Sequence, residues 1–228
     1  MKINPMSRFF TSIILTLTFN SFSASTNDTI EKFGIRAGID IQKIIKSATD
    51  NDYTGLSISG DIRLKESLYI FSELGNEEKI ISNYYLNSTV KGTYLKCGVN
   101  FKLNNDIRTQ NIVYSGFNLA FSQFEQRINS YTIYNTNSIY WGESIITEPI
   151  NLTDLKAFWV ELVFGLKAEI LNNLFIGFEL QLKSILKQNN KQNIINLYIP
   201  GFNRTYDGSN LGAGFSYNIS YLIPFVKK

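Results

Sequence analysis

After residue 30, apolar and polar side chains alternate with a period of two along most of the chain. Such alternation indicates β-strands with one apolar face. The clearest case is residues 158–170, where seven consecutive alternates are apolar and Glu161, Lys167 and Glu169 lie between them. A helix would need its apolar residues at three- and four-residue spacing. The pattern predicts eight strands, at residues 33–42, 56–64, 68–74, 94–103, 111–122, 158–170, 174–183 and 211–223.

The links between these strands alternate in length. Short links are expected at residues 65–67, 104–108 and 171–173, and long links at 46–53, 75–87, 123–154 and 187–210. In an up-and-down barrel with its N-terminus in the periplasm, every short link falls on the periplasmic side and every long link falls outside. The sequence therefore predicts an all-β fold, an eight-stranded antiparallel transmembrane β-barrel with short periplasmic turns and long extracellular loops.

The first residues have the features of a secretory signal peptide. Lys2 and Arg8 precede a mostly apolar run at residues 9–19, which is followed by small residues. This run is shorter than the ~18–20 residues that a helix needs to cross a bilayer. We therefore expect residues 1–24 to be a cleaved signal peptide, residues 25–228 to form the barrel domain, and the protein to reside in a bacterial outer membrane.

A soluble barrel that binds an apolar ligand in its interior is the alternative, because its strands alternate as well. The membrane version is favoured by the length of the apolar faces, since a tilted strand needs ~9–11 residues to cross the outer membrane. Aromatic side chains also gather toward the strand ends, where interfacial girdles form. In the membrane version the apolar faces point to lipid and the polar faces fill the lumen.

Charged side chains on the polar faces are nearly balanced in sign. They are Arg36, Asp61, Arg63, Glu73, Lys96, Glu161, Lys167, Glu169, Glu179 and Lys183, with Asp40 on the same face. Side chains just fill the lumen of an eight-stranded barrel, and an unpaired buried charge is costly. We expect these barrel-interior charges to form a plug of ion pairs, so that the protein is not an open porin.

Composition excludes several classes of function. The sequence has no histidine, which removes His-assisted hydrolases and His-ligated metal sites. Without residues 1–24 the chain has 20 basic and 19 acidic residues, so no basic field attracts nucleic acid. An enzyme would have to use carboxylates with Tyr or Ser, such as Glu161 with Glu169 or Asp61. We expect no enzyme, no cofactor and no metal site.

The long links contain the best candidates for contact with a ligand or protein partner outside the cell. These loop residues are Tyr131, Tyr134, Trp141, Tyr198, Arg204, Tyr206 and Asp207. Tyrosine gives a large contact area at low entropic cost. The alternative is that these aromatic residues pack the loops onto one another as a lid. The other expected partners are outer-membrane lipid and the insertion machinery, to which Tyr221 and Phe225 could supply a C-terminal aromatic signal.

Three loop strings carry a resemblance to a known family. They are residues 73–79 (ELGNEEK), 129–137 (NSYTIYNTN) and 196–210 (NLYIPGFNRTYDGSN). With them, nearly the whole chain from about residue 33 resembles an uncharacterised Bacteroidota family known only as a domain of unknown function. That resemblance implies an exported, barrel-like protein. It implies no activity, so it assigns no functional residue. The function expected is that of a small outer-membrane barrel of structural or surface-recognition type.

Overall fold

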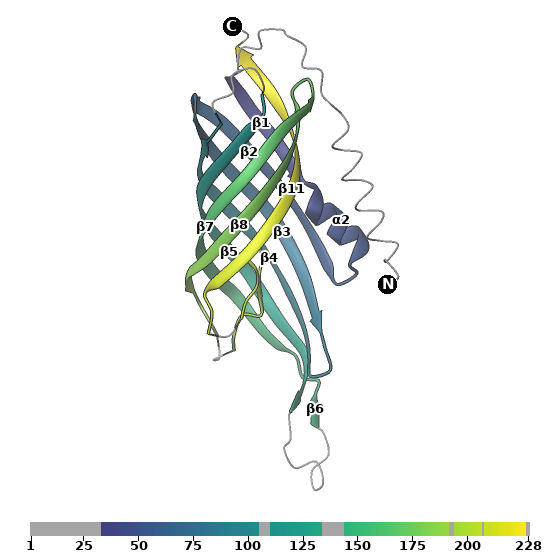
Figure 1. The fold of residues 1–228 in the computed structure, drawn as a ribbon. Helices are drawn as coiled ribbons and strands as arrows, with labels where there is room; N and C mark the ends of the chain where they lie inside the picture. The colour runs from purple at the N-terminus through teal and green to yellow at the C-terminus, as the bar shows by residue number, and fades with distance from the viewer. Residues whose placement is uncertain (1–32, 105–109, 134–143, 192–193, 207, 227–228) are drawn as a thin grey trace, which may run out of the picture.

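A computed structural model describes residues 33–104, 110–133, 144–191, 194–206 and 208–226. In this part of the chain, eight long antiparallel strands form a closed barrel (Figure 1). These strands are β1 (Phe33–Asp40), β2 (Tyr53–Lys65), β3 (Leu68–Ser82), β4 (Leu86–Lys102), β5 (Ile112–Ile133), β7 (Ile150–Leu171), β8 (Leu174–Gln188) and β11 (Leu211–Val226). The predicted signal peptide lies outside the described residues.

The eight strands follow one another around the barrel in chain order. Each pairs with the next, and β11 pairs with β1 to close the ring. This confirms the prediction of an eight-stranded up-and-down barrel. Three further strands among the described residues are short. β6 (Ser144–Ile146) pairs with the last three residues of β5, and β9 (Tyr198–Ile199) pairs with β10 (Asn203–Arg204) in a small hairpin.

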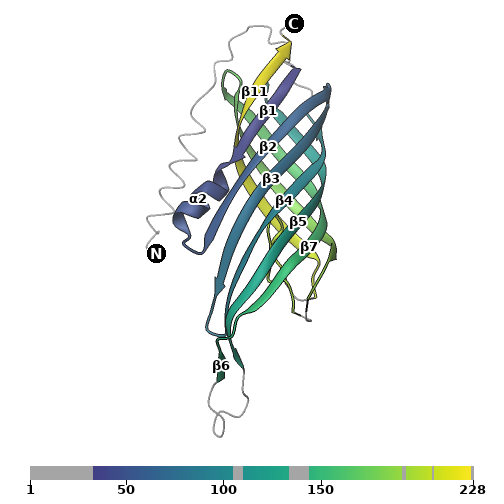
Figure 2. The same ribbon diagram turned by 180° about the vertical axis from the view of Figure 1, so that it is seen from behind.

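The two ends of the barrel differ. Tight turns at residues 66–67 and 172–173 lie at one end, here called the turn end, together with the end of β11 (Figures 1 and 2). Asn173 in the second turn has a φ of 67°, a left-handed conformation that asparagine tolerates. β6 projects from the opposite end, here called the loop end. Most of the predicted turn at 104–108 falls outside the described residues.

The outer surface carries an apolar band with a sharp edge toward the loop end. Its last apolar row runs across four neighbouring strands and consists of Leu74, Leu95, Phe121 and Phe158. Two residues further along each strand, the outward row is polar and consists of Asn76, Thr93, Gln123 and Lys156. On the turn-end side of this edge the apolar faces point outward, and on all four strands they end at the same level.

Beyond the edge, the apolar side chains lie inside and the polar side chains lie outside, which is the reverse of their arrangement in the apolar band. The strands continue toward the loop end with polar side chains outside and a core of apolar side chains inside, among them Val90, Phe124, Leu152 and Leu155. The links predicted at 75–87 and 123–154 are therefore wrong in large part, because β3, β4, β5 and β7 extend through them. The apolar outward face that the prediction followed ends before the strands do.

One helix, α2 (Ile41–Thr49), follows β1 and replaces the end of the predicted first strand. The carboxylate of Asp40 caps it by accepting a hydrogen bond from the Gln42 amide at 2.9 Å. Residues 41–42 and part of the predicted link at 46–53 are therefore helical, since the apolar residues Ile41, Ile44 and Ile45 have helical spacing. Among the described residues, no helix is long and apolar enough to cross a membrane.

The early end of β1 leaves part of the wall without a strand. β1 pairs with residues 218–226 of β11, whereas residues 211–217 of β11 pair with β8 alone among the described residues. On the other side, β1 reaches only to Ile58 of β2. Helix α2 lies beside this part of the wall (Figures 1 and 2).

Candidate functional site

Toward the turn end, the lumen is filled by ion pairs around Asp61. Its carboxylate accepts hydrogen bonds from Arg36 Nε at 2.7 Å and from Lys167 Nζ at 2.5 Å. The Arg36 guanidinium lies over the rings of Tyr69 and Phe175, at 5.0 and 5.3 Å from their centroids. All five side chains are buried. We call these five residues the turn-end cluster. Its three charged residues, Arg36, Asp61 and Lys167, each have an oppositely charged partner within it.

Toward the loop end, a second network of charges links helix α2 to the barrel wall. Lys43 Nζ on α2 lies 2.9 Å from Glu77 Oε1 and 3.5 Å from Glu73 Oε1, both on β3. Lys96 Nζ on β4 lies 3.2 Å from Glu161 Oε1 on β7 and 3.6 Å from Glu73 Oε2. We call these five residues the loop-end cluster. Within it, Glu73 contacts a lysine of the helix and a lysine of the neighbouring strand β4.

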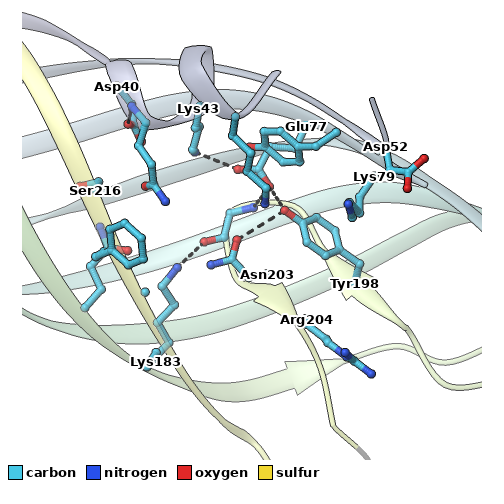
Figure 3. A pocket seen from close by; sticks show the side chains of 18 of the residues that line it. Asp40, Lys43, Asp52, Glu77, Lys79, Lys183, Tyr198, Asn203, Arg204 and Ser216 are labelled. Atoms are coloured by element: carbon cyan, nitrogen blue, oxygen red, sulfur yellow. Dashed lines mark hydrogen bonds and ion pairs between the residues drawn. The ribbon is translucent and has the colours of Figure 1, made fainter. Parts of the chain in front are cut away.

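The β9–β10 hairpin folds into the barrel mouth and closes it over the loop-end cluster. The Tyr198 hydroxyl donates to Glu77 Oε2 at 2.6 Å, and the Gly201 amide donates to the same oxygen at 3.0 Å (Figure 3). Burial and the negative charge of Glu77 raise the pKa of the Tyr198 phenol well above its usual value, so the hydroxyl keeps its proton. Lys183 Nζ donates to the Gly201 carbonyl at 2.8 Å.

Glycine is required at the tip of this hairpin. Gly201 has a φ of 81°, which L side chains rarely adopt, and a Cβ there would lie 2.6 Å from the Tyr94 ring. Tyr94 in turn donates to Glu73 Oε1 at 2.6 Å and contacts Lys43. The hairpin tip is thus fitted to the charged groups beneath it.

A cavity of about 750 Å³ lies between α2, the hairpin and β11. We call it the lateral cavity, because it reaches both faces of β11: outward-facing Ala213 and Phe215 line it together with inward-facing Gly214 and Ser216. Such lining places the cavity against the edge of β11 that faces α2. Lys43, Glu77 and Lys183 lie on its inner wall (Figure 3). The opening occurs where β1 has ended and where residues 211–217 of β11 have no second strand partner among the described residues.

Nearly the whole chain matches the model of a protein family. The model of a domain of unknown function, DUF6048, matches residues 6–228. The chain belongs to this family. Among solved structures, the DUF6048 chain is similar to Ail, the attachment invasion locus protein of Yersinia pestis. The TM-score is 0.43 at 6% identity, covering 85% of this chain and 99% of that one. No curated protein matches the chain.

The DUF6048 barrel buries nine of the ten predicted interior charges. These are Arg36, Asp61, Arg63, Glu73, Lys96, Glu161, Lys167, Glu179 and Lys183. Arg63 donates to the carbonyls of Lys65 and Glu66 at the β2–β3 turn. Glu169 differs, because it lies half-buried at the turn end and accepts from the Asn173 amide at 2.7 Å. It caps a turn and takes no part in the two clusters.

The predicted loop residues that the structure describes do not come together into one surface. Arg204 and Tyr206 are exposed, with the guanidinium 5.3 Å from the ring centroid. Tyr131 is half-buried in β5, opposite Leu86 and Ile146. Tyr198 is a buried residue of the β9–β10 hairpin and is not part of the exposed surface. Tyr134, Trp141 and Asp207 lie outside the described residues.

Two members of the loop-end cluster, Glu77 and Lys43, are not among the predicted interior charges. Glu77 was assigned to a link, although Glu73, Gly75, Glu77 and Lys79 continue the inward alternation of β3. The signal was hidden because Asn76 and Glu78 end the apolar outward face. Lys43 belongs to the helix that was not predicted. Its position after Asp40, a residue type favoured at helix N-caps, was the available signal.

The carboxylate pairs considered for catalysis are separated or neutralised. Glu161 and Glu169 lie eight residues apart on β7, about 26 Å at ~3.3 Å per residue. Asp61 is held by two cations in the turn-end cluster. Within the described residues, no group of three or more potential ligands among Cys, Asp and Glu is arranged to hold a metal ion.

Proposed function

We propose that this protein is a small outer-membrane barrel of structural or surface-recognition type, neither an open porin nor an enzyme. The apolar band carries this proposal. Large apolar side chains such as Leu119, Leu162 and Ile223 are about half exposed on the outer surface, whereas the buried interior holds charged side chains such as Glu161 and Lys167. The soluble alternative with an apolar interior requires the opposite orientation of these faces.

The dimensions of the band fit a bilayer. On β7 the apolar outward alternates run from residue 158 to 170. About twelve steps of ~3.3 Å, tilted by ~40°, span roughly 30 Å, close to the thickness of a hydrocarbon core. The tight turns then lie in the periplasm, and the polar extension of β3, β4, β5 and β7 projects outside the cell. Residues 1–24 would direct export.

Two observations support a closed lumen. The turn-end cluster occupies one level of the interior, and the loop-end cluster with the hairpin occupies another. An ion path would have to separate paired charges at both levels, at a high energetic cost. In planar bilayers, the purified protein should show no large, stable conductance, and porin-like steps would contradict the closed lumen.

Recognition would use exposed residues at the loop end. Arg204 and Tyr206 present a cation stacked on an aromatic ring. Replacing both with alanine should leave assembly intact and abolish binding of any extracellular partner. Unchanged binding of an identified partner would exclude this surface.

Cell fractionation and gel mobility test the location. The protein should be found with the outer membrane, and the folded barrel should migrate differently on a gel before and after heating. Recovery of the protein in the soluble periplasmic fraction would contradict the proposal.

A further inference from the structure

The wall of the barrel is open toward the surrounding medium at the lateral cavity. Within the part of the chain that the structure describes, the edge of β11 between residues 211 and 217 that faces away from β8 has no strand beside it, and α2 stands opposite. Outward-facing Ala213 and Phe215 belong to the apolar band and line the cavity. On α2, Ile44 and Ile45 are exposed on the outward side, while Lys43 points into the lumen. A group that enters here comes from the side of the apolar band.

Among the basic side chains on the outer part of the cavity, Lys79 pairs with Asp50 at 3.0 Å, whereas Lys46 and Arg204 have no acidic partner among the described residues. Lys46 Nζ on α2 lies 3.9 Å from the centroid of the Tyr53 ring. Lys79 is the cross-strand partner of Tyr53, so the two lysines flank one ring. No carboxylate of the described residues lies within ion-pair distance of Lys46 or Arg204, which both line the cavity. Glu73 and Glu77, the acids on the inner wall, are already paired.

An outer groove lies next to the cavity on its turn-end side. It has a volume of about 550 Å³ and a mostly apolar lining. Ala37, Gly60 and Ser72 lie opposite one another on β1, β2 and β3, and their small outward side chains leave this space. Ile39 borders the groove, and the next residue, Asp40, lines the lateral cavity. From the cavity, the groove extends along β1 toward the turn end.

We propose that the lateral cavity and this groove bind one anionic, phosphate-bearing lipid of the outer leaflet. Its phosphate lies at Lys46, and one acyl chain lies along the groove. The proposal rests on the proposed function, because the lipid reaches the opening only if the barrel lies in a membrane. A phosphate supplies the acidic partner that Lys46 lacks among the described residues, through a charge-assisted hydrogen bond.

The direction of the site agrees with an outer-leaflet lipid. The basic residues lie toward the loop end, where headgroups of the outer leaflet would be, and the apolar groove runs toward the bilayer centre. A free anion from water would use the charges but would gain nothing from the groove or from the lateral opening. The apolar lining thus favours a lipid over a free phosphate.

Lipid retention tests this proposal directly. The full chain is purified in detergent and titrated with phosphatidylglycerol or with phosphatidylcholine of the same acyl chains. Bound lipids are then counted by native mass spectrometry. One phosphatidylglycerol should be retained about tenfold more tightly than phosphatidylcholine, the effect expected of one charge-assisted hydrogen bond. Equal retention of both lipids would overturn the proposal.

Matched variants locate the site. Lys46→Gln should weaken phosphatidylglycerol retention about tenfold, whereas Lys91→Gln, on the exposed outer face of β4, should leave it unchanged. Ala213→Trp should block the opening, whereas Ala168→Trp, on the outward face of β7, should not. If both members of either pair behave alike, the lipid does not bind in this cavity.

Two further measurements separate the outcomes. Glycerol phosphate should not displace the lipid; displacement at equal concentration would assign the site to a free anion instead. Heat-modified gel mobility and insertion into vesicles are recorded for the wild type and each variant. A wild type that inserts but retains no phosphatidylglycerol contradicts the lipid site alone. A wild type that does not insert contradicts the proposed function.

Discussion

Lys43 on helix α2 and Glu77 on strand β3 form an ion pair of 2.9 Å inside the barrel. Glu77 is also the acceptor for the hairpin, through the Tyr198 hydroxyl and the Gly201 amide. One buried carboxylate therefore holds the helix that replaces part of the wall and the loop that closes the mouth. A local change at either residue should affect both elements.

Lys43→Met tests this coupling. The substitution leaves Glu77 and Glu73 close together without their shared cation, and loss of one partner of a buried ion pair costs about 3 kcal/mol. We expect the urea midpoint of the refolded barrel to fall, and proteolysis within residues 41–52 and 196–206 to increase together. Lys91→Met is the matched control on the outer face. Protection of both segments in Lys43→Met would contradict the coupling.

The turn-end cluster gives a second prediction, on stability. Asp61→Asn removes the charge that separates Arg36 from Lys167 and should destabilise the barrel by about 3 kcal/mol, as for other broken buried ion pairs. Asp50→Asn breaks a partly exposed pair with Lys79, which should cost much less, because solvent weakens such pairs. Urea titration of both variants in the same vesicles compares them. Equal losses would mean that the interior charges do not depend on one another.

The edge of the apolar band predicts a depth-dependent effect of arginine. Leu119 and Gln123 lie on the same face of β5, on opposite sides of the row that contains Phe121. Leu119→Arg should cost about 2–4 kcal/mol of folding free energy in vesicles, and Gln123→Arg at most about 1 kcal/mol. Similar costs for the two variants would place the edge elsewhere.

Within the apolar band, alternation alone was enough to predict the strands. Residues 158–170 and 174–183 were found because each has one apolar face, and the turn at 172–173 was found because it separates them. The loop-end half could not be found in this way. At Asn76 and Gln123 the outward face becomes polar while the strand continues, so a period-two search for apolar alternates stops too early.

The lateral opening was hidden for a different reason. Ile39 and Ile41 continue the alternation of the first strand, yet β1 ends at Asp40 because this residue caps a helix. Only the following residues, Ile44 and Ile45 on one side and Lys43 and Lys46 on the other, distinguish a helix from a strand. The charges that α2 brings to the cavity meet partners 30 or more residues away, such as Glu73 and Glu77. No local pattern indicates those contacts.

The central claim is that the apolar band lies in a bilayer, and Cys97 allows a direct test. Cys97 is the single cysteine of the sequence and is exposed on the outward face of β4, opposite Leu119. A fluorophore on Cys97 in the vesicle-reconstituted protein should be quenched by lipids brominated on their acyl chains and shielded from aqueous iodide. In a Cys97→Ser background, the same fluorophore at Gln123→Cys should show the reverse. Quenching at Cys97 by iodide, with no effect of the brominated lipids, would contradict a membrane-spanning barrel.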